Sequence, residues 1–271
     1  MNTNDSDGAA TAPDQPAQPT RAGALQPAPP NAAHYRDINL ARLQQMGIVT
    51  QDGGRSSVAE DFRIIKRPLL RAARSAGAAA IEHGNLIVVT SALPGEGKTY
   101  CAVNLAISIA MEMDITVLLV DADVARPSVL KVLGLPAAPG LMDILQDDSL
   151  LLSDVILRTN VATLSILPAG HSTKHATELL ASQAMSALLA DIASRYADRI
   201  VIFDSPPLLM TTEAPVLAGQ MGQVVLVVEA ETTTQNAVKE ALRQIDGCRH
   251  VHLIYNKTKA YPGSDYYGYY E

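Results

Sequence analysis

The stretch of sequence that decides the fold is LIVVTSALPGEGKT, residues 86–99. Its first five residues are apolar or β-branched, which is typical of a buried strand. Gly95 and Gly97 then allow the backbone to curl so that several N–H groups face one anion, and a helical pattern begins directly after them. A strand, a glycine-rich loop and a helix in this order indicate a P-loop, which binds phosphate groups.

Two side chains of this loop suit a nucleoside triphosphate. Lys98 would reach the β- and γ-phosphates, and the Thr99 hydroxyl would ligate Mg²⁺. Ala92 replaces the first glycine of the consensus, so a glycine-rich turn without a ligand is the alternative. The coincidence of strand, loop, Lys-Thr pair and helix argues against that alternative. The residues expected at the nucleotide are Pro94, Gly95, Glu96, Gly97, Lys98, Thr99 and Tyr100.

Two further apolar runs end in carboxylates. Residues 117–123 read VLLVDAD, with Asp121 and Asp123 at positions i and i+2, and residues 200–207 read IVIFDSPP, with Asp204 at the end of a Walker B pattern. The ligand crevice of an open α/β sheet lies outside the carboxyl ends of its strands, so these residues are expected beside the P-loop. Together they indicate Mg²⁺-nucleoside triphosphate chemistry. Alternatively, one member of the pair caps the following segment, or Asp204 is a turn residue.

Short apolar runs alternate with helical patterns from residue 85 onward. This alternation predicts an α/β fold with a doubly wound, mostly parallel sheet, as a single domain of the P-loop NTPase type. The expected strands are 86–90, 116–120, 164–167, 200–203, 224–228 and 251–255, and the expected helices lie near 99–112, 128–134, 178–197 and 233–247.

The composition excludes several classes of protein. The chain has 271 residues, a net charge of −7 and a pI near 5.4, which argues against a dedicated nucleic-acid binder. Its two cysteines are too few for a disulfide scaffold, a four-cysteine zinc site or a cysteine-rich iron–sulfur site. The sequence has neither an 18-residue apolar run nor a signal-peptide pattern, so we expect a cytoplasmic location.

The N-terminal part divides in two. Residues 1–33 contain nine Ala and six Pro and few large apolar residues, so a disordered tail is expected there. Residues 34–80 are expected to be helical, with a short helix over 38–48 and a longer one over 60–80 that Pro68 interrupts. The basic face of the longer helix is either solvated or a partner surface.

Tyrosines gather after the main domain, which is expected over 81–259. Five of the nine tyrosines fall in the segment 260–271, separated by Gly, Ser and Asp. Because chain termini are usually mobile and glycine-interrupted aromatics suit no core, a phosphoacceptor tail is the functional interpretation. A sticky aromatic patch or a tail packed on the sheet edge are the alternatives. The candidate phosphoacceptors are Tyr261, Tyr266, Tyr267, Tyr269 and Tyr270.

Together the motifs resemble those of the bacterial tyrosine kinase family, which combines a P-loop, a D-x-D motif called Walker A′, a Walker B motif ending in D-x-P and a C-terminal tyrosine cluster. Here they read PGEGKT (94–99), LLVDADVARP (118–127), VIFDSPP (201–207) and YPGSDYYGYY (261–270). More narrowly, the chain is similar to autokinases found with exosortase-linked exopolysaccharide gene clusters. The resemblance covers roughly residues 36–271 and departs at Ala92 and at Ala125, where many relatives carry a basic residue.

The resemblance implies an ATP- and Mg²⁺-dependent protein-tyrosine autokinase that phosphorylates its tail in trans. Asp121 would be the base toward the tyrosine hydroxyl, assisted by Asp123, and Thr99 and Asp204 would hold Mg²⁺ directly or through water. Asn256 resembles a position that contacts adenine in related P-loop proteins, and a turn asparagine is its alternative.

The resemblance also implies an assembly and partners. The helix EDFRIIKRPLL at 60–70 is similar to one that mediates ring assembly in relatives, where Glu60, Arg63 and Lys66 would act, with Lys66 standing where Arg is common. The expected partners are further copies of the chain in a ring, an inner-membrane polysaccharide co-polymerase or chain-length activator that recruits the chain peripherally, and a cognate tyrosine phosphatase. The process regulated would be exopolysaccharide synthesis or export.

The rival function is an ATP-dependent oligomerisation switch resembling the partitioning ATPases, in which the tyrosines form an interaction surface. Those ATPases carry a signature lysine one residue after the first P-loop glycine, and here that position is Leu93. A catalytically silent adaptor is disfavoured by the intact Lys98, Asp121 and Asp204. Phosphotyrosine on the purified protein discriminates the kinase from the switch.

Overall fold

The computed structural model describes residues 1, 34–54, 56–195 and 198–259. The disordered tail predicted over residues 1–33, except for Met1, lies outside the described residues. The mobile tyrosine tail predicted over 260–271 also lies outside them. In the part that is described, no helix is long and apolar enough to cross a membrane.

The strands of the described chain form one eight-stranded sheet. They are β1 (Tyr35–Arg36), β2 (Leu86–Ser91), β3 (Thr116–Asp121), β4 (Leu157–Thr159), β5 (Leu164–Leu167), β6 (Arg199–Asp204), β7 (Gln223–Glu229) and β8 (Val251–Asn256). Their order across the sheet is β1-β4-β5-β3-β6-β2-β7-β8, and every neighbouring pair is parallel except β4 and β5. The strand that leads into the P-loop, β2, therefore lies between β6 and β7.

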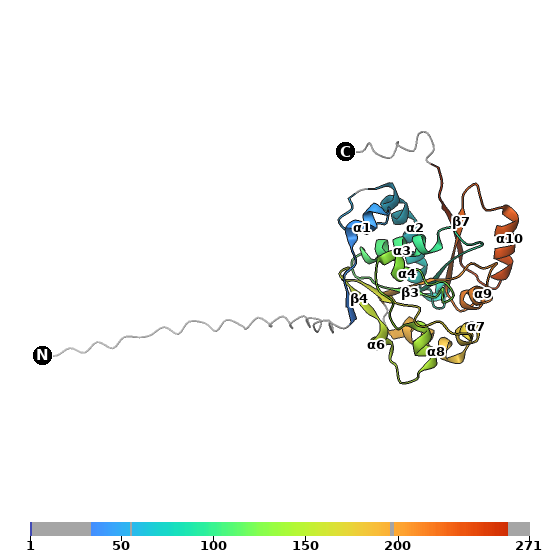
Figure 1. The fold of residues 1–271 in the computed structure, drawn as a ribbon. Coiled ribbons are helices and arrows are strands. Elements are labelled where there is room, and N and C mark those ends of the chain that lie inside the picture. The colour runs from blue at the N-terminus through green and yellow to red at the C-terminus, as the bar shows by residue number, and fades with distance from the viewer. Residues whose placement is uncertain (2–33, 55, 196–197, 260–271) are drawn as a thin grey trace. The chain divides into compact units, whose positions relative to one another are not determined.

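Helices cover both faces of the sheet (Figure 1), which confirms the doubly wound, mostly parallel α/β fold. One face carries α1 (Leu40–Gln45), α2 (Ser57–Ala73), α3 (Lys98–Ala110) and α4 (Val129–Leu133). The other face carries α5 (Leu141–Gln146), α6 (Leu152–Val155), α7 (Ala176–Leu180), α8 (Gln183–Arg195), α9 (Glu213–Ala218) and α10 (Gln235–Gln244).

The two helical layers enclose two apolar cores, one on each face of the sheet. Along β2, Ile87 and Val89 enter the core under α3, whereas Leu86 and Val88 enter the opposite core. Since side chains alternate across a strand, a strand buried on both faces must be apolar at nearly every position. Phe62 of α2 packs into the first core, so the segment 34–80 and the sheet share one core.

Helix α2 corrects the expectation of an interruption at Pro68, because it runs unbroken from Ser57 to Ala73. Pro68 has no N–H to donate to the carbonyl of Ile64, four residues earlier. Ile64 is 64% exposed, so this carbonyl lies on the side of the helix that faces water, where the lost hydrogen bond costs least.

The helix expected over 178–197 is two helices, α7 and α8. The Ser182 hydroxyl accepts a hydrogen bond from Met185 N–H and so caps the start of α8. The sequence pattern also gave no indication of β1, β4, α5, α6 or α9, all of which are short.

Candidate active site

The P-loop joins β2 to α3, and two of its glycines have left-handed backbone angles. The φ angle is 87° at Gly95 and 95° at Gly97, the N-cap of α3. Residues with a side chain rarely adopt such angles. A Cβ atom at Gly97 would also lie 2.1 Å from Asn256 Nδ2. The left-handed backbone angle and the close approach of the Asn256 side chain therefore both favour glycine at position 97.

Three strand ends meet beside this loop, in the arrangement that the sequence predicts. In the register of the sheet, Asp121 of β3 lies opposite Asp204 of β6, and Asp204 lies opposite Val89 of β2. Because these strands are parallel, their carboxyl ends share one edge of the sheet with the P-loop.

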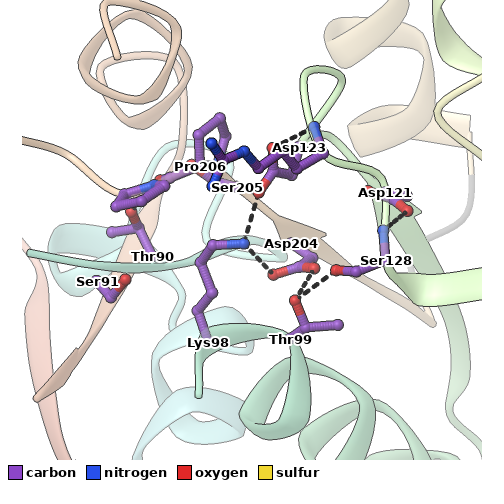
Figure 2. Close-up of polar contacts among 12 residues, drawn as sticks. Thr90, Ser91, Lys98, Thr99, Asp121, Asp123, Ser128, Asp204, Ser205 and Pro206 are labelled. Carbon is purple, nitrogen blue, oxygen red and sulfur yellow. Dashed lines mark hydrogen bonds and ion pairs between the residues drawn. The ribbon is translucent and has the colours of Figure 1, made fainter. Parts of the chain in front are cut away.

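Lys98 and Thr99 contact the acidic residues directly (Figure 2). The Lys98 ammonium lies 2.7 Å from Asp123 Oδ2 and 3.8 Å from Asp204 Oδ1. The Thr99 hydroxyl donates to Asp204 Oδ2 at 2.6 Å and lies 2.8 Å from the hydroxyl of Ser128. Ser128 is an addition to the predicted site, since its place in the sequence just before a short helix gives no sign of this contact.

Asp121 occupies the same site but also holds the start of a helix. Its Oδ2 accepts hydrogen bonds from Ser128 N–H and Val129 N–H, both at 3.0 Å, where α4 begins. The other oxygen of Asp121, Oδ1, is buried and has no hydrogen-bond partner among the described residues. Asp123 also accepts a backbone hydrogen bond, from Arg126 N–H to its Oδ1 at 3.1 Å, so both members of the acidic pair cap the segment that follows them.

The site is short of positive charge. Burial raises the pKa of Asp204 to about 7, although the nearby Lys98 ammonium opposes the shift. Burial also raises the pKa of Asp121 to about 6, against the effect of the two N–H groups of α4. The charge of the Lys98 ammonium, which pairs with Asp123, thus leaves the pKa values of Asp121 and Asp204 raised, and a bound cation would stabilise the ionised forms of these two carboxyls.

The residues present fit Mg²⁺. Like Asp121 Oδ1, Asp204 Oδ1 is buried without a hydrogen-bond partner in the described chain, and carboxylate and hydroxyl oxygens are ligands that this ion prefers. No cluster of three or more His, Cys, Asp or Glu side chains suited to a metal occurs within the described ranges. Mg²⁺ usually takes one or two protein carboxylates and completes its shell with water and substrate phosphates.

Glu96 is a buried carboxylate within the P-loop itself, with 2% of its surface exposed. Its Oε2 accepts a hydrogen bond from Leu93 N–H at 2.7 Å, and its Oε1 contacts the hydroxyl of Thr233, in the segment after β7. The side chain expected at the nucleotide therefore closes the loop and ties it to a neighbouring segment.

The end of β8 also contacts the P-loop. Asn256 Nδ2 donates to the Glu96 carbonyl at 2.8 Å, so the amide expected to contact adenine is bonded to the loop backbone. The Lys257 ammonium donates to the Gly95 carbonyl at 2.7 Å and pairs with Glu229 at 2.9 Å. Sequence reasoning missed Lys257, because a contact between residues 162 positions apart leaves no local pattern.

Tyr100 points away from the loop. Its hydroxyl donates to the Gly47 carbonyl at 2.7 Å, which ties the first turn of α3 to the N-terminal segment. Any contact of Tyr100 with a nucleotide would therefore come from its backbone.

The three residues expected to mediate assembly separate into two environments. Glu60 and Arg63 form an exposed ion pair at 3.0 Å on α2. Lys66 is buried, and its ammonium donates to the Ser108 carbonyl at 2.5 Å and pairs with Glu112 at 2.6 Å. Lys66 is thus bound inside its own chain, near the C-terminal end of α3, rather than displayed beside Glu60 and Arg63. The assembly role itself stays a prediction.

Comparison with known proteins assigns the family. Residues 84–257, more than half of the chain, match the family described as AAA domain. The tyrosine-protein kinase YwqD of Bacillus subtilis is 33% identical over 186 residues, which cover 68% of this chain and 76% of the relative. The chain belongs to the bacterial tyrosine kinase family.

Two further comparisons show how much of a family member this chain represents. The putative tyrosine-protein kinase EpsB of Ralstonia nicotianae is 33% identical over 186 residues, which cover 69% of this chain. The same alignment covers 23% of the relative, so the match spans about a quarter of that protein's length. In the solved structure of the VpsO kinase domain, the similarity covers 74% of this chain and 96% of that domain, at 30% identity and a TM-score of 0.62.

Proposed function

We propose that the protein is an ATP-dependent protein-tyrosine autokinase that phosphorylates its C-terminal tyrosine cluster in trans. One observation carries the proposal. Lys98, Thr99, Asp123 and Asp204 form a single contact network beside a P-loop, in a chain whose last eleven residues include five tyrosines. The relatives named as tyrosine-protein kinases support the same chemistry.

The proposed step transfers the γ-phosphoryl group of ATP to a tyrosine hydroxyl. A bond forms between the phenolic oxygen and the γ-phosphorus, and the bond from that phosphorus to the β,γ-bridging oxygen breaks, so that ADP leaves with the electron pair. The phenolic proton passes to Asp121 Oδ1. Within the described residues this oxygen has no hydrogen-bond partner, and the pKa of its carboxyl, raised to about 6 by burial, suits a base near neutral pH.

The other residues position and neutralise charge. The Lys98 ammonium, which forms an ion pair with Asp123 in this structure, would turn toward the β- and γ-phosphates and stabilise the charge that develops there. Thr99 and Asp204 would hold Mg²⁺, which when bound supplies further neutralisation of the phosphate oxygens. The N–H groups of the P-loop, from Pro94 to Tyr100 (the proline itself excepted), would cradle the phosphates.

Phosphorylation in trans requires an assembly. The exposed Glu60–Arg63 pair on α2 is the surface we propose for contact between copies, within an oligomerisation segment over 34–80. An inner-membrane polysaccharide co-polymerase would activate the assembly and recruit it to the membrane surface, and a tyrosine phosphatase would reset it. The regulated process is proposed to be exopolysaccharide synthesis or export.

The experiment separates the kinase site from the acceptor. One chain keeps the site but lacks residues 261–271, and a second chain carries Lys98→Met but keeps its tail. The two are mixed with Mg-ATP, and intact mass with peptide mapping locates the phosphate. Phosphate on Tyr261–Tyr270 of the Lys98→Met chain is expected, and a mixture containing Lys98→Met in both chains is the control.

Each other outcome has a definite meaning. If the wild-type chain phosphorylates itself but the Lys98→Met chain stays unmodified in the mixture, the transfer occurs in cis. If every chain binds ATP and changes its oligomeric state but none gains phosphotyrosine, even with the membrane activator added, the chain is a nucleotide-dependent switch and the kinase proposal fails.

A further inference from the structure

Two consecutive residues, the last residue of β8 and the one after it, hold two backbone carbonyls of the P-loop. Asn256 Nδ2 donates to the Glu96 carbonyl at 2.8 Å, and Lys257 Nζ donates to the Gly95 carbonyl at 2.7 Å. Both hydrogen bonds end on backbone oxygens of the loop that the mechanism requires to bind phosphate. Neither side chain touches the network of Lys98 and the three aspartates in the described structure.

Lys257 is fixed from two directions. Its backbone has a φ angle of 58°, a left-handed value that is uncommon for a residue with a side chain. Its ammonium bridges the Gly95 carbonyl and Glu229 Oε2 at the end of β7, 2.9 Å away. The neighbouring strands β7 and β8 thus both contribute to one clamp on the loop.

The geometry of the peptide bond links these contacts to the nucleotide. A trans peptide unit is planar, so the C=O of one residue points opposite to the N–H of the next. Holding the Gly95 carbonyl outward therefore turns the Glu96 N–H inward, and holding the Glu96 carbonyl outward turns the Gly97 N–H inward. These are the N–H groups that a P-loop directs at phosphate.

Resting on the proposed nucleotide binding, we propose that Lys257 and Asn256 are positioning residues for the nucleotide phosphates. They act through the peptide planes of Gly95 and Glu96 and do not contact the nucleotide phosphates themselves. Removing these side chains therefore weakens the binding of every nucleotide whose α- and β-phosphates occupy the loop. ATP and ADP are affected alike, because the same N–H groups bind both.

The chain offers a matched control for Lys257. Lys259 lies two residues further on and also pairs with a glutamate, Glu231, but it makes no contact with the P-loop in the described structure. Lys257→Met and Lys259→Met therefore change net charge equally at nearly the same place, and only the first removes the clamp.

The experiment measures ATP and ADP dissociation constants by calorimetry on the full-length wild-type chain and on Lys257→Met, Lys257→Arg and Lys259→Met. We expect Lys257→Met to weaken the binding of both nucleotides by the same factor, about three- to tenfold, because the Lys257 side chain is half exposed and its hydrogen bond is worth less than a buried one. Lys257→Arg, which keeps a charged donor, should recover most of the affinity. Lys259→Met should stay within about twofold of wild type.

Three results would overturn the inference. If Lys257→Met binds both nucleotides as wild type does, the clamp does not position the loop. If the affinity for ATP falls and the affinity for ADP does not, Lys257 contacts the γ-phosphate directly. If Lys259→Met loses as much affinity as Lys257→Met, general electrostatics accounts for the loss. A wild-type chain that binds neither nucleotide would instead refute the proposed function, so the two failures are distinguishable. Thermal unfolding without nucleotide should stay within about 2 °C for all variants.

Discussion

Asp121 and Asp204 lie opposite each other in the parallel register of β3 and β6, and each buries one carboxylate oxygen that has no hydrogen-bond partner in the described chain. The Lys98 ammonium lies 3.8 Å from Asp204 Oδ1 and 2.7 Å from Asp123 Oδ2. Such a site destabilises the fold until a cation neutralises it, because ionised carboxylates lose hydration on burial. The arrangement therefore lowers the stability of the chain without ligand and favours the binding of a cation.

The first prediction concerns Asp204 and pH. Because burial raises the pKa of Asp204 to about 7, the folded chain keeps a proton that the unfolded chain has released above about pH 4. The stability contributed by this carboxyl therefore falls as pH rises from about 4 to 7 and stays low above that range. Relative to wild type, Asp204→Asn should gain free energy of unfolding between pH 5 and 8, on the order of 2 kcal/mol, in urea titrations without nucleotide.

The control for this prediction is Asp147→Asn. Asp147 is exposed, and hydrogen bonds from Ser149 lower its pKa, so its contribution is constant over the same pH range. If the stability difference for Asp204→Asn were equally constant, Asp204 would not hold a proton in the folded chain.

The second prediction concerns Thr99 and Mg²⁺. Thr99→Val keeps the shape of the side chain but removes the hydroxyl that donates to Asp204 Oδ2. We expect ADP affinity in EDTA to change little, whereas the gain in affinity on adding Mg²⁺ should drop by about tenfold, the typical effect of losing one ligand or its support. Calorimetry with and without Mg²⁺ measures both.

Ser128→Ala is the matched control, because the Ser128 hydroxyl contacts Thr99 but is not an expected ligand. An equal loss of the Mg²⁺ effect in both variants would mean that the hydroxyl pair acts through packing, and Thr99 would lose its assignment.

The third prediction concerns Gly97. Gly97→Ala places a Cβ atom 2.1 Å from Asn256 Nδ2 in a residue whose φ angle is 95°. The variant should lose nucleotide binding and about 2–3 kcal/mol of unfolding free energy, part from backbone strain and part from the clash. Adding Asn256→Ala should relieve the clash and restore part of the stability. Calorimetry and urea titration record the two effects.

Gly54 provides the comparison for the backbone contribution alone. Its φ angle is 65°, and a Cβ atom there would lie within 4 Å of no atom of the described residues other than its chain neighbours. Gly54→Ala should cost about 1 kcal/mol and leave nucleotide binding unchanged. If Gly97→Ala lowered the free energy of unfolding no more than Gly54→Ala does, the close approach of Asn256 would not contribute to the loss of stability.

The fourth prediction separates assembly from stability on α2. Lys66→Ala removes a buried ammonium from the Ser108 carbonyl and Glu112, so it should lower the free energy of unfolding by about 1–3 kcal/mol. Arg63→Ala loses only an exposed pair and should change stability by less than about 0.5 kcal/mol. If α2 mediates assembly, Arg63→Ala should reduce the oligomer mass in light scattering.

The opposite pattern would reassign the helix. An unchanged oligomer in Arg63→Ala together with a dissociated but fully stable Lys66→Ala chain would show that Lys66 leaves its partners on α3 to join a neighbouring subunit.

The strands and the candidate site were predictable from the sequence for the same reason. Burial on both faces demands nearly continuous apolar runs, so β2, β3, β6 and β7 were visible as such. Once these runs are parallel neighbours, the acidic residues that end β3 and β6 must converge on the P-loop. Sequence and topology together therefore suffice to bring Lys98, Asp121 and Asp204 into one place.

The remaining features depend on contacts that leave no local pattern. β1 has two residues and β4 has three, too short for a periodicity to develop. The basic pattern of α2 predicts outward-facing charges, but Lys66 is drawn inward by carbonyl and carboxylate partners more than 40 positions away. The clamp of Lys257 on Gly95 likewise depends on the docking of β8 beside β7, a property of the sheet as a whole.

Lys257, which is bound to the P-loop, also lies a short stretch of sequence before the C-terminal tyrosines. Tyr261 lies four residues after it and Tyr270 thirteen. An extended chain covers at most about 3.5 Å per residue, so Tyr261 stays within about 14 Å of Lys257 and Tyr270 within about 45 Å. Since the Lys257 ammonium lies 2.7 Å from its own P-loop, the spacing between P-loops in an assembly decides which tyrosines can reach a neighbouring subunit and which are confined to their own.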